Sequence, residues 1–73
     1  MIRTVVLNQN EILVAAIEEP LFAAPTALLA ECKRQYRKAT NLSDIHFLTK
    51  MIDCFRNKHY TIDENESTIY VNI

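Results

Sequence analysis

The sequence predicts a small α+β domain with three helices, an N-terminal strand and a C-terminal β-hairpin. Three observations lead to this fold class. The 73 residues are enough for one hydrophobic core and too few for two. Hydrophobic residues make up 49% of the chain and the formal charge is only -1, a composition that folds. After Lys58 the hydrophobic period changes from 3.6 to 2. We therefore expect residues 1–73 to form a single domain.

The N-terminal segment predicts a strand followed by a first helix. Residues 2–7 are rich in β-branched side chains and run directly into the polar residues 8–10, which is typical of a strand that ends in a turn. Asn8 and Glu11 are spaced like a capping box, and the apolar residues that follow gather on one helical face. We expect this helix to end by Glu19, because Pro20 comes next.

Two further helices are predicted in the middle of the chain. The second opens at Pro25 and Thr26, and its apolar positions lie within about 100° of arc, at Leu28, Leu29, Cys32, Tyr36 and Ala39. Asn41 or Ser43 is expected to cap the third helix. Apolar residues cover about half the circumference of that helix, at Ile45, Phe47, Leu48, Met51, Ile52, Cys54 and Phe55.

The last fifteen residues predict a β-hairpin. Tyr60 and Ile62 alternate with polar residues in one run, and Ile69, Val71 and Ile73 do so in the next. The segment 63–66 between them is polar and would form the tip of the hairpin, with Asn65 expected to take the left-handed conformation.

Composition excludes several classes of function. The chain contains no glycine, so loops that cradle a phosphate or carry a catalytic nucleophile are not expected. Cys32, Cys54, His46 and His59 show neither the paired spacing of a zinc site nor a nucleophile with an oriented base. We predict no enzymatic activity, no catalytic residue, no metal and no cofactor. Without a signal-like segment or an apolar run of about 20 residues, and with only two cysteines, we expect a cytoplasmic protein that binds no membrane.

Residues 46–53 combine exposed and core positions in the manner of a recognition helix, residues 56–62 follow like the exit into a wing strand, and residues 67–71 like the returning strand. This succession resembles the winged helix-turn-helix superfamily. The resemblance implies a winged-helix-like fold that binds DNA and regulates transcription.

The charge distribution points to the same function. Residues 26–58 carry seven Lys or Arg against three acids, a balance of +4, whereas residues 1–25 carry -2 and residues 59–73 carry -3. Basic residues on two consecutive helices in the middle of the chain are the pattern expected of a surface that binds phosphates. The predicted base contacts come from His46, Thr49, Lys50 and Asn57, and the predicted backbone contacts from Lys33, Arg34, Arg37, Lys38, Arg56 and Lys58.

A protein-binding module is the alternative, and the sequence leaves both functions open. The hairpin tip is acidic, and the overall charge of -1 is low for a nucleic-acid-binding protein. In this alternative the interaction residues are Asp63, Glu64, Glu66 and Tyr70. The partner is therefore duplex DNA or, alternatively, a larger protein. A homodimer is expected for DNA binding, because one small module buries too little surface for tight specific binding.

Overall fold

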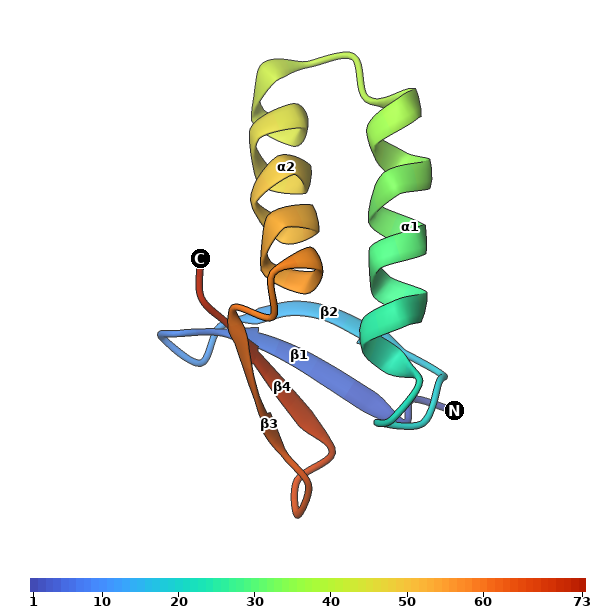
Figure 1. Cartoon of the computed structure of the whole chain (residues 1–73), viewed down its shortest axis with the longest axis vertical. Coiled ribbons are helices and arrows are strands. Elements are labelled where there is room, and N and C mark those ends of the chain that lie inside the picture. The colour runs from blue at the N-terminus through green and yellow to red at the C-terminus, as the bar shows by residue number, and fades with distance from the viewer.

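The chain folds into two antiparallel helices that stand on one face of a four-stranded sheet (Figure 1). The structure is a computed structural model that describes residues 1–73. The elements follow in the order β1 (Thr4–Asn8), β2 (Leu13–Ile17), α1 (Ala24–Lys38), α2 (Leu42–Arg56), β3 (Tyr60–Asp63) and β4 (Thr68–Val71). The domain is therefore α+β, with two β-hairpins that flank one helical hairpin in the sequence.

The sheet joins the two ends of the chain. Its strand order is β2-β1-β4-β3, and the two hairpins meet along a parallel pairing between β1 and β4. Val6 is opposite Ile69 in that pairing, and both side chains are fully buried. The neighbouring pair of Leu7 and Tyr70 points to the other face, because side chains alternate along a strand. The helices cover only the face that carries Val6 and Ile69.

The predicted first helix is wrong, because residues 13–17 form strand β2. This segment pairs antiparallel with β1, and a bulge shifts the register between Val6 and Leu7. The side chain of Asn8 does accept backbone N–H groups, as predicted, but those of Asn10 and Ile12 in a tight turn. An Asx side chain supports either a helix start or a turn. Here the turn forms and β1 gains a pairing partner, which leaves the domain with two helices instead of three.

The two remaining helices follow the sequence prediction closely. Helix α1 begins at Ala24, where Pro25 occupies the first turn and needs no hydrogen-bond acceptor for its nitrogen. Helix α2 begins after Asn41, whose side-chain oxygen accepts from the backbone N–H of Asp44 at 2.9 Å. The amide of Asn41 donates in return to the Asp44 carboxylate, which makes the cap reciprocal.

The turns of this glycine-free chain place three other residues at positive φ. They are Glu11 (φ 62°) before β2, Lys58 (φ 58°) after α2 and Ser67 (φ 47°) before β4. The C-terminal hairpin is confirmed, but its left-handed residue is Ser67 and not Asn65. The carboxylate of Asp63 accepts hydrogen bonds from the N–H groups of Asn65 and Glu66. The tip therefore bends at these residues, before the chain reaches Ser67.

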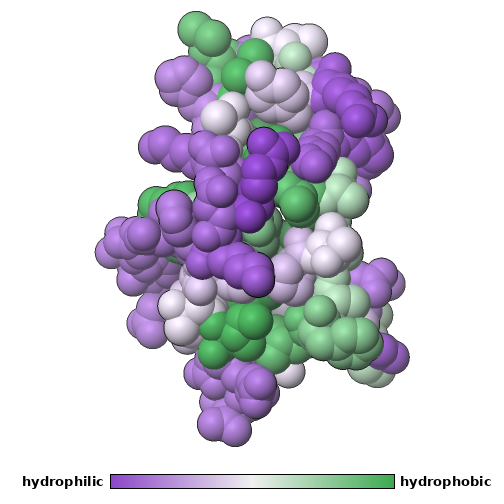
Figure 2. Space-filling view, viewed as in Figure 1, coloured by the Kyte–Doolittle hydropathy of each residue, from purple (hydrophilic) through white to green (hydrophobic).

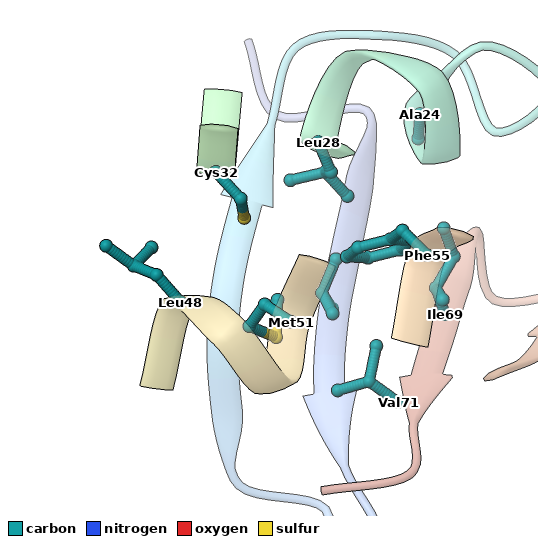
Figure 3. Packing of buried hydrophobic residues seen from close by; sticks show 9 residues of the cluster. Ala24, Leu28, Cys32, Leu48, Met51, Phe55, Ile69 and Val71 are labelled. Carbon is teal, nitrogen blue, oxygen red and sulfur yellow. The ribbon is translucent and has the colours of Figure 1, made fainter. Parts of the chain in front are cut away.

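The core lies where the helices meet the covered face of the sheet. In Figure 3, Met51 lies among side chains from α1, α2 and the sheet, and only 1% of it is exposed. Phe55 lies beside Ile69 in Figure 3 and also meets the Tyr60 ring, at 5.5 Å between ring centroids. Because these contacts occupy the sheet end of the helical hairpin, the end near the connecting loop projects away from the sheet (Figure 1).

Neither helix is long and apolar enough to cross a membrane.

Candidate nucleic-acid interface

Two grooves run along the seam between α1 and α2, one on each side of the helical hairpin. We define the cationic groove as the one that contains Lys33, Arg37 and Arg56; it has a volume of about 460 Å³. Its cations come from both helices, with Lys33 and Arg37 on α1 and Arg56 on α2. The remaining lining residues are Tyr36, Thr49, Ile52 and Asp53. In Figure 2, hydrophilic side chains gather over the two helices, and hydrophobic ones form a band across the sheet end.

Helical spacing creates this groove. On α1, Lys33 and Arg37 are one turn apart, and on α2 the lining residues recur every three or four positions from Thr49 to Arg56. Each helix therefore contributes one ridge of side chains. Arg37 and Arg56 lie in the last turns of antiparallel helices, so they mark the opposite ends of the groove.

The cations of the groove have no internal partners. The only salt bridges in the structure join Met1 to Glu18 and Arg34 to Glu31. Lys33, Arg37 and Arg56 are exposed and make no ion pair, although the Asp53 carboxylate lines the same groove. Three cations against one carboxylate leave the groove with a net positive charge that is available to an anion.

Arg34 and Lys38 face the other side of the hairpin. They line the second groove together with Phe47. The guanidinium of Arg34 donates two hydrogen bonds to the Glu31 carboxylate, which lowers the pKa of Glu31 and raises that of Arg34. The four predicted cations of α1 therefore border two different grooves, with Lys33 and Arg37 at the cationic groove and Arg34 and Lys38 at the second.

The four predicted base contacts are dispersed, as is Lys58, which was predicted to contact the nucleic-acid backbone. Thr49 lines the cationic groove, but its hydroxyl donates to the Ile45 carbonyl at 2.7 Å and offers a ligand only its lone pairs. Lys50 lines a separate hollow near the C-terminus, and Lys58 lines another beside β3. His46 and Asn57 are exposed and line neither groove.

Sequence reasoning missed three residues of the cationic groove: Ile52, Asp53 and, most informatively, Tyr36. Its place on the apolar arc of α1 predicted a core position, but 45% of it is exposed. The useful signal was its spacing, because Lys33, Tyr36 and Arg37 fall on one helical face. On α2, Ile52 and Asp53 belong to the same ridge as Thr49 and Arg56.

The residues predicted for the protein-binding alternative lie at the opposite end of the molecule. The tip of the β3–β4 hairpin and the loop between the helices mark the two ends of the long axis in Figure 1. Asp63, Glu64 and Tyr70 line one open hollow there, and Glu66 is exposed outside it. The molecule thus carries cations on its helices and carboxylates at its hairpin tip.

The two cysteines are free thiols buried on the helices. Burial raises the pKa of Cys32 and of Cys54 above the ordinary thiol value, which favours the neutral form. The Cys54 thiol also donates to the Asn72 carbonyl at 3.6 Å.

These features define a small α+β protein with one cationic groove between two helices. Comparisons with protein-family models, with curated proteins and with solved structures gave no match to this chain.

Proposed function

We propose that the protein is a small, non-enzymatic, cytoplasmic nucleic-acid-binding regulator whose cationic groove holds the phosphate backbone. One observation carries this proposal: three cations from two helices line one groove and make no ion pair within the protein. Unpaired Lys and Arg side chains that share a groove suit a polyanion, because each phosphate contact releases counterions. The winged-helix arrangement predicted from the sequence has three helices, so the proposal rests on the groove and not on a wing.

Salt dependence tests the phosphate contacts. Three contacts correspond to a slope of log K against log salt of about -2.1 for a single strand and about -2.7 for a duplex. Affinity for a mixed-sequence oligonucleotide should then fall roughly 20- to 40-fold between 50 and 200 mM salt. Fluorescence anisotropy with a labelled oligonucleotide measures this slope. No binding at about 20 mM salt would end the proposal.

A pair of double variants locates the site. Lys33→Ala with Arg37→Ala removes two cations from the cationic groove, and Arg34→Ala with Lys38→Ala removes two from the second groove of the same helix. All four positions are exposed and helical, so both variants should fold. We expect the first to lose most of the binding and to reduce the salt slope by about 2. Equal losses in both variants would show that the cationic groove is not the binding site.

A protein-binding module is the second candidate, favoured by the meeting of Asp63, Glu64 and Tyr70 in one hollow. Charge reversal separates the hollow from the rest of the acidic tip. Glu64→Lys should release a bound partner, whereas Glu66→Lys should retain it, because Glu66 lies outside the hollow. A pull-down with both variants makes the measurement, and equal retention in both would count against this surface.

A further inference from the structure

Two hydrophobic residues, Tyr36 and Ile52, line the cationic groove beside its charged ones. Tyr36 is 45% exposed, and Ile52, from the facing helix, is half-buried beside it. A ligand that contacted the groove only through its phosphates would make no use of these two apolar side chains. An aromatic ring between cations offers a planar surface on which a base can stack.

The length and the polar groups of the groove further restrict the class of ligand that it can bind. Arg37 and Arg56 lie in the last turns of antiparallel helices, several helical turns apart, so the groove is longer than one nucleotide. Asp53 is unfavourable next to phosphate, yet its carboxylate can accept a hydrogen bond from the amino group of a base. The Thr49 hydroxyl is likewise left with only its accepting lone pairs.

We propose that the cationic groove binds single-stranded nucleic acid and that the Tyr36 ring stacks against one of its bases. This inference rests on the proposed function and specifies its ligand. In a duplex both faces of a base are covered by its neighbours, so only an unpaired base can lie flat on Tyr36. Lys33 and Arg37, beside Tyr36 on the same helical face, would hold the flanking phosphates.

Substitutions at Tyr36 separate stacking from apolar cover. Tyr36→Phe keeps the ring and Tyr36→Leu keeps apolar bulk without it. The probes are a labelled single strand of about ten nucleotides and the duplex of the same sequence. We expect the protein to bind the single strand more tightly than the duplex. Tyr36→Leu should weaken single-strand binding roughly five- to hundredfold, with Tyr36→Phe close to the original protein. Phe47→Leu, at an exposed aromatic residue of the second groove, is the matched control and should change nothing.

A fluorescence reporter gives a readout that a purely structural role would not produce. The chain has no tryptophan, so Tyr36→Trp introduces a single indole into the groove. A base stacked on it should quench its emission on single-strand binding, and a bound duplex should not. Equal affinity for single strand and duplex, or equal loss of both in Tyr36→Leu, would overturn the inference while leaving phosphate binding intact. Failure of the proposed function looks different, because no oligonucleotide would then bind at low salt.

Discussion

Replacing Lys58 by glycine should stabilise the protein. Lys58 follows the last turn of α2 with φ 58°, and the next N–H, of His59, donates back to the Cys54 carbonyl at 2.8 Å. This is a helix end that glycine usually occupies. The left-handed conformation costs a residue with a Cβ about 1–2 kcal/mol, which glycine avoids. Glycine also makes the unfolded chain more flexible, and this lowers the stability by about 0.5–1 kcal/mol. The net gain is about 0.5–1 kcal/mol.

That gain corresponds to a rise of about 2–8 °C in Tm for a domain of this size. Thermal and urea unfolding followed by circular dichroism at the helix band measure it. Asn57→Gly is the matched control, because Asn57 has φ -100° and gains nothing from glycine. Lys58→Ala removes the charge and keeps the Cβ, so it should leave the stability nearly unchanged.

The reasoning would be refuted if Lys58→Gly destabilised the protein as much as Asn57→Gly, or if Lys58→Ala stabilised it equally. Lys58 also lies outside the cationic groove. Lys58→Gly should therefore bind oligonucleotides as the original protein does, so that the stability effect and the binding effect can be measured separately.

Three other perturbations have defined outcomes. Met51→Ala empties a fully buried position and should cost about 2–5 kcal/mol, measured as a lower urea midpoint; a loss below 1 kcal/mol would mean that this core is not tightly packed. Because burial raises the pKa of Cys32 and Cys54, the unfolded chain loses thiol protons first as pH rises, so their contribution to stability is complete below about pH 8.5 and declines above it. Urea titrations at several pH values should show a smaller decline when both cysteines are replaced by alanine, and an identical decline would contradict the assignment. Asp53→Asn adds an amide donor to the groove and should reduce any preference for oligo(dC) over oligo(dT), measured by anisotropy; an unchanged preference would remove Asp53 from base recognition.

Much of the fold could be predicted from local chemistry. Asn41, one of the two predicted caps, caps α2, Pro25 lies in the first turn of α1, and the period-2 alternation after Lys58 gives the β3–β4 hairpin. Residues 12–17 could not be assigned correctly on local grounds. Their apolar spacing fits a helical face, but pairing with β1 decided the outcome, and that pairing depends on the whole sheet.

The candidate site was also predictable only in part, because it depends on how the two helices pack. Lys33, Arg37, Thr49 and Arg56 do come together, and each was predicted to contact nucleic acid. Composition could not show that Arg34 lines the second groove instead of the cationic groove. Adjacent helical positions differ by about 100° in direction, so which of two neighbouring cations borders the seam depends on how the two helices pack.

The parallel pairing of β1 with β4 has a consequence for synthesis of the protein. A ribosome makes β1 first and β4 more than fifty residues later, so the central ladder of the sheet cannot close while the chain is still short. Until β4 has been made, the apolar side chains of the N-terminal hairpin lack the strand that pairs beside them. The two helices, in contrast, can already contact each other, because they are neighbours in the sequence. Nascent chains halted before residue 68 should therefore be open to protease along residues 1–20, and chains that include β4 should be protected there.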